Sequence, residues 1–502
     1  MSLNSESRVL AIALDAAEPT LIRELIEQGE LPALKALLDQ GKWLRVESPA
    51  HIGSGSVWPT FITGEEPYVH GVYGEWCWRP ATMSLERYSG EGLTPFWKQL
   101  AENGLTVGIL DVPFAPLIGL AEGFEISEWG PHDLLKGQLE FFPPEVTDVV
   151  KRRTSPHPLS SDRLDAAGPA DYEGLRKLSS ACQDGVKLRG ALAHELISKR
   201  RPRLSIIAFT EIHHSAHYLW HNIVPAHEIY DQSALRKLAR VEPTLKEIYR
   251  EVDRQIDGLV TTAGADTVLV FSLHGMKAAH GIPSFLGPLL CEKGFARLAR
   301  WSDQSWSRRA ATLMGAIKRG TPAALKEFYY KTLPPGAAQR LARPTMMPAY
   351  DWNNTHAFPL PTDQHGWIRI NLRGREASGI VAPEDYQQTC QQLEQLLRSL
   401  ITDDGRPLVR RVTGTANGAD GPPLPDLVVQ WENAAFASPL KIQGSSVGTP
   451  PVGTKFTGQH SLEGFCIMRG GGDFQEGDCV RAGDLGQIIS KILKGSGGKD
   501  PT

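Results

Sequence analysis

The chain has 502 residues, which is enough for a large hydrophobic core and for one large domain with an insertion. Its 53 basic and 57 acidic residues nearly balance, and without a basic patch the charge pattern predicts no nucleic acid as a macromolecular partner. The six cysteines are widely spaced with no Cys-x-x-Cys pair, which indicates reduced thiols rather than a disulfide framework.

The first apolar run, residues 9–14, follows a polar N-terminus and ends at an acid. It is too short for the apolar region of a signal peptide, and no stretch of the chain reaches the roughly 18 apolar residues that cross a bilayer. We therefore expect a soluble, cytoplasmic protein without a membrane partner. The sequence carries no signal for an oligomeric state.

Short apolar runs alternate with stretches of helical spacing along the chain. The runs that we expect to be strands cover residues 9–14, 106–110, 204–209, 267–271, 367–372, 427–430 and 465–468. They are apolar on both faces, as buried parallel strands are. Helical spacing marks residues 18–40, 226–263 and 383–401. This alternation predicts an α/β fold with a doubly wound, mostly parallel central sheet and helices on both faces.

Two segments interrupt the alternation and are predicted to be inserted caps. Residues 283–350 are rich in Trp, Arg and Lys, and residues 131–185 contain a patch rich in Pro, His and Ser. We expect a first part of the core over 1–282, the cap over 283–350, the rest of the core over 351–494 and a disordered tail over 495–502. The sequence identifies no substrate-binding residue. Candidate wall residues, which could equally pack a cap onto the core, are Trp76, Trp78, Arg79, Trp352, Asn354, His356 and His365.

Two residues near the N-terminus are candidates for metal binding and nucleophilic catalysis. Asp15 ends the first apolar run, where it can reach a metal or cap the helix that starts near Glu18. Ser54 lies between two glycines at an expected helix start, whose free N–H groups favour an anion. A metal that lowers the pKa of the hydroxyl would let Ser54 attack phosphorus, and the alternative is a helix-capping loop. Ser56 is the rival nucleophile.

Histidines gather behind the later apolar runs. His213 and His217 are four residues apart, so on a helical turn both face the same side and can chelate a metal; the alternative is a solvated helix start. His274 is followed by a glycine that allows a sharp turn, His460 lies in a loop flanked by glycine, and each is ambiguous alone. Because open α/β sheets bind ligands at strand ends, the set as a whole indicates a metal-assisted phosphoryl-transfer site.

The order and spacing of these motifs resemble the alkaline phosphatase superfamily, in its branch of type I phosphodiesterases and nucleotide pyrophosphatases. The most specific match is the segment from Trp58 to Gly71. In the family the nucleophilic Thr or Ser lies ten residues before the glycine that corresponds to Gly64, and counting back from Gly64 gives Ser54. Ser272-Leu-His-Gly-Met is similar to the family's Ser-Asp-His-Gly-Met, and residues 370–381 and 458–460 match two further motifs. The resemblance spans residues 9–492 and implies an alkaline-phosphatase-like fold, with the caps unmatched.

The resemblance implies two metal positions, and this chain lacks one acid at each. One position would take Asp15, the Ser54 oxygen and His274, with Leu273 where the family has an acid. The other would take His217 and His460, with His213 in place of an acid. Two divalent ions beside Asp15 alone would leave three positive charges, against one in the family's plan, which is expensive in a partly buried cleft.

Three interpretations resolve this excess of charge. Glu211 or an acid that the sequence does not place supplies negative charge, the substrate is unusually anionic, or one ion alone binds tightly. We favour the last, because His213, His217 and His460 form a three-histidine set with an open position, the pattern of catalytic zinc or iron sites. Zinc is the expected divalent metal, with manganese or iron as alternatives, and the second site is in doubt.

The implied function is metal-dependent hydrolysis of phosphate esters, with phosphodiesters or pyrophosphates favoured. Ser54 would form a phospho-enzyme intermediate with a small phosphorylated substrate. One alternative is a relative with little or no catalytic activity that binds a phosphorylated ligand, and Leu273 is the feature in its favour. Another is a sulfatase, a phosphonate hydrolase or a phosphomonoesterase on the same core. The persistence of Ser54 and the histidines favours an enzyme.

Overall fold

The computed structural model divides the chain into two compact units. Unit 1 comprises Met1–Tyr73, Ser89–Ala279 and Gly453–Thr502, and unit 2 comprises Gly74–Tyr88 and His280–Val452. The residues that the structure describes are 7–88, 90, 92–130, 139–154, 157–159, 169, 171–223, 245–279, 285–300, 302, 309, 346–361, 364–415, 424–432, 441–448 and 456–495.

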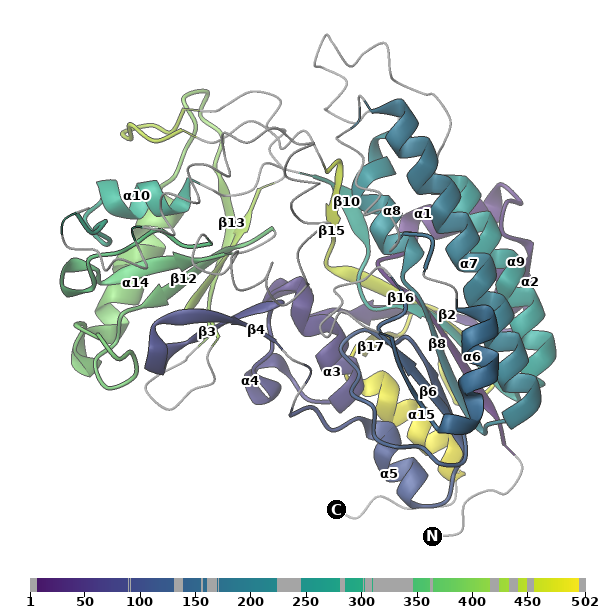
Figure 1. Cartoon of the computed structure of the whole chain (residues 1–502). Helices are drawn as coiled ribbons and strands as arrows, with labels where there is room; N and C mark the ends of the chain where they lie inside the picture. The colour runs from purple at the N-terminus through teal and green to yellow at the C-terminus, as the bar shows by residue number, and fades with distance from the viewer. Residues whose placement is uncertain are drawn as a thin grey trace. The chain divides into compact units, whose positions relative to one another are not determined.

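A nine-stranded sheet forms the centre of unit 1 (Figure 1). From one edge to the other its strands are β17 (Cys479–Arg481), β2 (Lys42–Glu47), β16 (Glu463–Arg469), β9 (Thr267–Ser272), β1 (Val9–Leu14), β8 (Leu204–Phe209), β5 (Val107–Leu110), β6 (Phe124–Ser127) and β7 (Glu140–Phe142). The strands from β9 to β6 run parallel, and β16 and β7 are antiparallel to their neighbours. β1, β8 and β9 bury every side chain, as inner strands covered on both faces do.

Helices cover both faces of this sheet (Figure 1). One layer contains α1 (Pro19–Glu27), α2 (Pro32–Asp39), α6 (Thr147–Arg153), α7 (Tyr172–Arg200), α8 (Glu211–Leu219) and α9 (Leu245–Ala263). The other contains α3 (Val57–Thr63), α4 (Pro67–His70), α5 (Phe96–Glu102) and α15 (Asp484–Lys494). Along α9 the buried residues recur every three or four positions, which gives one apolar stripe toward the core. The predicted doubly wound α/β fold is confirmed.

The predicted helix over 18–40 is two helices. Gly29 adopts a φ of +76°, which ends the chain's helical path after α1, and Pro32 opens α2, where its fixed φ suits the first turn. The predicted helix over 226–263 is described from α9 onward, and residues 224–244 lie outside the described residues. The predicted strands at 9–14, 106–110, 204–209 and 267–271 are confirmed as β1, β5, β8 and β9.

Unit 2 is built on a four-stranded antiparallel sheet. Its strands are, in order, β11 (Ala357–Leu360), β12 (Gly366–Ile370), β14 (Leu427–Trp431) and β13 (Val409–Gly414). The hairpin of β3 (Trp76–Arg79) and β4 (Ser84–Arg87) and the helices α10 (Leu286–Glu292) and α14 (Tyr386–Arg398) complete it. The runs 367–372 and 427–430 form β12 and β14, and the run 465–468 forms β16 of unit 1. All three are antiparallel to their neighbours, so the expectation that they are parallel strands is wrong. An apolar run reports that a strand is buried, but it does not encode the strand's direction.

The motif after β12 that resembles the family's Asn-Leu-Lys-Gly-Arg-Glu run holds unit 2 together. Arg375 pairs with Asp426 at 2.7 Å, and Arg369 pairs with Glu376 at 2.8 Å, all four side chains being buried. Trp78 donates from Nε1 to Glu376 at 2.7 Å. Each buried charge therefore meets an opposite one within the core of unit 2. Trp78, a predicted wall residue, is 1% exposed and belongs to this core.

The predicted caps lie partly outside the described residues. The described part of 131–185 contributes β7, α6 and the start of α7 to unit 1, and the described part of 283–350 includes α10 of unit 2. Residues 496–502 of the predicted tail are also outside the described ranges. The cap and tail assignments therefore stay predictions. None of the helices in the described ranges is both long and apolar enough to span a membrane.

Candidate metal centre

Three neighbouring strands of the unit 1 sheet end at residues that the sequence analysis selects. β1 lies between β9 and β8 and is parallel to both, so the carboxyl ends of the three strands are side by side. Asp15 follows β1, α8 with His213 follows β8, and His274 follows β9. The short strand β15 (Gly458–His460) pairs with β10 (Met276–Ala278), which brings the end of β15 to the same place.

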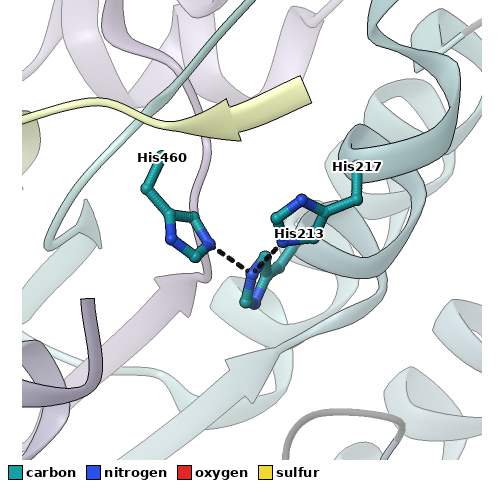
Figure 2. A group of neighbouring side chains, drawn as sticks. All are labelled: His213, His217 and His460. Atoms are coloured by element: carbon teal, nitrogen blue, oxygen red, sulfur yellow. Dashed lines mark hydrogen bonds between the residues drawn. The ribbon is translucent and has the colours of Figure 1, made fainter. Parts of the chain in front are cut away.

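Three histidines converge at these strand ends (Figure 2). His213 and His217 lie one turn apart on α8, and His460 ends β15. Nε2 of His213 is 2.9 Å from Nε2 of His217 and 2.7 Å from Nε2 of His460. Among the described residues, these three offer a ligand group whose atoms all lie within 4.8 Å of one another. Their number and type are those of a catalytic zinc or iron site.

The other ring nitrogens decide whether this group fits a cation. Nδ1 of His217 lies 2.9 Å from the carbonyl oxygen of Gly458, which can accept a hydrogen bond but cannot donate one, so this Nδ1 carries the proton. Nδ1 of His213 lies 2.8 Å from Oδ2 of Asp15 and donates to that carboxylate in the same way. In a neutral ring each Nε2 then presents a lone pair. The lone pairs of His213 and His217, whose Nε2 atoms are 2.9 Å apart, repel unless a cation lies between them, so these two rings fit a metal ion.

Asp15 contacts the histidine group as a hydrogen-bond acceptor. It is 2% exposed, and while Oδ2 faces His213, Oδ1 accepts the indole N–H of Trp58 at 3.0 Å. Trp58, itself 2% exposed, was considered in the sequence only as part of the family-like segment. No local pattern could have linked it to Asp15, because the contact joins residues 43 positions apart.

His274 and Ser54 differ in their surroundings. His274 is 2% exposed, and its ring centroid lies 4.7 Å from that of His460 and 6.0 Å from that of His213. Ser54 is partly exposed and opens the 3-10 turn Ser54–Ser56 that leads into α3. His274 therefore packs against two of the three converging rings. The roles of Asp15, Ser54, His213, His217, His274 and His460 as metal ligands stay predictions.

The turn that carries Ser54 separates it from its rival. Ser56 is fully buried, and its hydroxyl donates to the carbonyl oxygens of Pro49 at 3.0 Å and Gly53 at 2.7 Å. The amides of Ser56 and Val57 also donate within the turn, to Gly53 and Ser54. The expectation that the amides after Ser54 are free for an anion is wrong for these two, because the 3-10 turn uses them. The geometry favours Ser54 over Ser56 as the nucleophile.

Glu211 does not supply charge to the histidine group. Its fully buried carboxylate accepts from Nε of Arg189 at 3.0 Å and lies 3.0 Å from Nε2 of His157. Burial opposes the charge of Glu211, but Arg189 and His157 outweigh it and hold the pKa of the carboxyl at about 2. The carboxylate of Glu211 is thus bound to Arg189 and His157 and is not part of the ligand group of the three histidines, so the structure gives no support to the interpretation that Glu211 compensates the metal charge.

Glu18 is an acid beside the centre that sequence reasoning assigned only to a helix start. Its carboxylate accepts from the amide of Met276 at 3.1 Å and from Oγ of Ser461 at 3.1 Å, and it caps α1 through Thr20. Met276 and Ser461 belong to the segments of His274 and His460. Burial raises the pKa of Glu18. One carboxylate therefore ties together the segments that follow β1, β9 and β15.

His70 supports the helix that follows Ser54 and predicts a pH dependence of stability. Its Nδ1 accepts from the amide of Val72 at 3.1 Å, so Nε2 donates to Oγ1 of Thr60 on α3 at 3.0 Å. Burial lowers the pKa of His70 from 6.5 to about 4. Between these values the unfolded chain binds the proton and the folded chain does not, so the free energy of unfolding falls as the pH falls.

We expect His70→Gln to remove this contribution. Urea unfolding at several values between pH 4 and pH 6.5 should then show a shallower loss of stability than the wild type, by up to about 1.4 kcal/mol per pH unit. Above pH 7 the slopes of the two proteins should agree. Equal slopes throughout would show that His70 does not carry the effect.

Comparison with known protein families gives one match. Residues 9–433 match the model of the family described as type I phosphodiesterase / nucleotide pyrophosphatase. No curated protein matches the chain in sequence.

Solved structures share the fold at low sequence identity. Phosphonoacetate hydrolase from Sinorhizobium meliloti 1021, in complex with phosphonoacetate, is 14% identical over 98% of both chains with a TM-score of 0.51. Its complex with phosphonoformate is 15% identical over 98% of both chains, with a TM-score of 0.50. Murine ectonucleotide pyrophosphatase / phosphodiesterase 5, in complex with AMP, is 11% identical over 97% of this chain and 95% of its own, with a TM-score of 0.46. At such identities the likeness to the first two structures shows a shared fold alone.

Proposed function

The chain belongs to the type I phosphodiesterase and nucleotide pyrophosphatase family, and from that premise we propose that it is a metal-dependent hydrolase of phosphate esters. The observation that carries the proposal is the convergence of the Nε2 atoms of His213, His217 and His460. Phosphodiesters or pyrophosphates are the favoured substrates because they define the family. The expected partner is a small phosphorylated molecule.

The three histidines would hold one divalent ion, with zinc as the expected metal and manganese or iron as alternatives. When bound, the ion would supply Lewis-acid stabilisation of charge on phosphoryl oxygens and would lower the pKa of water. The ring protons that His213 and His217 hold at Nδ1 keep their Nε2 lone pairs directed at the common point. Three protein ligands leave a position open for substrate. Leu273 weakens the second position, at Asp15, Ser54 and His274.

Ser54 would act as the nucleophile in two displacements. In the first, a bond forms from Oγ to phosphorus while the bond from phosphorus to the leaving oxygen breaks, and the leaving group departs with the electron pair. The hydroxyl proton of Ser54 passes to solvent. In the second, a water oxygen bonds to phosphorus, the bond to Oγ breaks, and Ser54 recovers a proton. Ester and water are the reactants, and no oxidant or reductant is required.

The proposal is tested by a substrate panel on the purified full chain. The panel contains bis-p-nitrophenyl phosphate, p-nitrophenyl phosphate, p-nitrophenyl sulfate and phosphonoacetate, each with zinc, manganese, iron or calcium added separately. Phosphonoacetate is included because a protein of the same fold is named as its hydrolase. We expect the diester to be hydrolysed fastest. Binding of a phosphorylated ligand without turnover under any condition would instead support the non-catalytic alternative.

Replacing Ser54 with alanine should lower the turnover of the best panel substrate by roughly a thousandfold or more, because the attacking oxygen is lost. Steady-state rates with the preferred metal measure this. Ser56→Ala is the matched control. It removes a buried hydrogen bond and should cost about 1 kcal/mol of stability, while the folded variant keeps its turnover. If Ser56→Ala rather than Ser54→Ala abolishes turnover, the nucleophile is Ser56.

A further inference from the structure

We propose that Asp15 is not a metal ligand in this chain but a positioning residue, which fixes the proton of His213 at Nδ1 and is itself held by Trp58. The inference rests on the proposed function and goes beyond it, because it makes the centre a one-ion site with an outer carboxylate. Asp15 would then act on the ion through His213. Carboxylates that accept from the second ring nitrogen of a metal-binding histidine act in this way in other proteins.

Both oxygens of Asp15 already have donors. Oδ2 accepts from Nδ1 of His213 at 2.8 Å, and Oδ1 accepts from Nε1 of Trp58 at 3.0 Å. Asp15 and Trp58 are each 2% exposed and His213 is 8% exposed, so water competes little for these hydrogen bonds. A buried carboxylate that accepts two hydrogen bonds from side chains is oriented by them. Its orientation is toward the ring of His213.

The two substitutions relative to the family's plan explain why Asp15 takes this part. An aspartate at position 213 would use its oxygens on an ion and would have no N–H to donate. His213 uses Nε2 for the ion and brings an Nδ1 proton that needs a buried acceptor, which Asp15 provides. Leu273, 3% exposed, removes the second acid with which Asp15 would share an ion. The same two substitutions therefore remove one ion position and give Asp15 its role as the acceptor for His213.

The pairing with Trp58 makes the inference testable by Asp15→Asn. The indole N–H is a donor and can face only the amide oxygen of Asn, so the amide NH2 group turns toward Nδ1 of His213. Nδ1 must then accept, which moves the ring proton to Nε2 and removes the lone pair that faces the ion. We therefore expect Asp15→Asn to weaken zinc binding by about 10- to 100-fold, although the Asn side chain has nearly the same size and shape as that of Asp.

A second substitution should reverse this loss. Trp58→Phe removes the indole N–H, so the Asn amide can rotate and present its oxygen to Nδ1–H of His213. The double variant Asp15→Asn with Trp58→Phe should then bind zinc at least about tenfold more tightly than Asp15→Asn alone. Trp58→Phe by itself leaves the carboxylate of Asp15 as the acceptor for His213, so it should weaken zinc binding less than Asp15→Asn does. Zinc affinity is measured by competition with a chelator, and ions per chain by elemental analysis.

The outcomes separate this inference from the proposed function. One zinc per wild-type chain with rescue by Trp58→Phe supports the positioning role. Two ions in the wild type and one in Asp15→Asn would make Asp15 a ligand, which overturns the inference but leaves a metal-dependent hydrolase. A double variant no better than Asp15→Asn would show that charge, and not the ring proton, is what Asp15 supplies. A wild type that binds no ion would overturn the proposed function as well.

Discussion

Substitution of His217 with alanine is expected to strip the ion from the protein and to abolish hydrolysis. The Nε2 of His217 is one of the three atoms proposed to bind the ion, and the Nδ1 of His217 donates to the carbonyl oxygen of Gly458. Full sets of four zinc ligands contribute about 10–16 kcal/mol, so losing one ligand should weaken binding by roughly a hundredfold or more. Elemental analysis after dialysis, chelator competition and rates on the best panel substrate measure the three consequences.

His214→Ala is the matched control for this variant. His214 lies on the same helix between His213 and His217, its ring centroid is 5.6 Å from that of Tyr218, and it is not part of the ligand group. The same side chain is removed from α8 without removing a ligand atom. His214→Ala should therefore keep both ion and activity. Equal loss in the two variants would point to a general disturbance of α8, and retention of the ion by His217→Ala would remove His217 from the ligand set.

The position of this site was predictable because strand ends are visible in sequence. The mostly apolar runs before Asp15, His213 and His274 are inner strands of the sheet, and inner parallel strands end together at one edge. Direction was not predictable for β12 and β14, because an antiparallel strand covered on both faces has the same composition. The split of 18–40 into α1 and α2 was visible as Gly29 and Pro32, but the helical spacing on either side masked it.

Contacts between side chains from distant segments could not be predicted in the same way. The spacing of His213 and His217 follows from helix geometry, whereas the pairing of Asp15 with His213 depends on the neighbouring positions of β1 and β8 in the sheet. The hydrogen bond from Trp58 to Asp15 joins residues that are 43 positions apart in the sequence. Glu211 shows the opposite failure, since the sequence left it open as a source of negative charge at the centre. Its side chain points instead toward Arg189.

The network around Arg189 is the structural support of α8 and of the histidines on it. Arg189, on α7, is fully buried, and it bonds Glu211 at 3.0 Å and Asp111 at 2.8 Å. Asp111 also accepts from the amides of Trp129 and Gly130, and His157 donates to Glu211. One guanidinium thus bridges the two carboxylates that follow β5 and β8. Removing one partner of such a network leaves a buried charge without compensation.

Arg189→Met is therefore expected to lower the free energy of unfolding at pH 7 by about 3–5 kcal/mol, as measured by urea denaturation. Arg153→Met is the matched control. Arg153 pairs with Glu195 at 2.9 Å, but its side chain is 43% exposed, so solvent screens the pair and the change should stay within about 1 kcal/mol. A loss at Arg189 no larger than at Arg153 would mean that the buried carboxylates find other compensation.

The pH dependence of stability distinguishes the mechanism of this loss, because the contribution of Glu211 to that dependence changes sign in Arg189→Met. In the wild type the pKa of Glu211 is lowered from 4.5 to about 2, since Arg189 and His157 outweigh the burial that raises it, so this contribution to stability is present above pH 4.5 and is lost toward pH 2. Without Arg189 the largest remaining influence on Glu211 is burial, which raises its folded pKa above the unfolded value. Acidification from pH 7 to pH 5 then lets the folded variant take up a proton, and the stability difference from the wild type should shrink. A difference that stays constant between pH 7 and pH 5 would assign the loss to packing around the methionine instead of to an unpaired carboxylate.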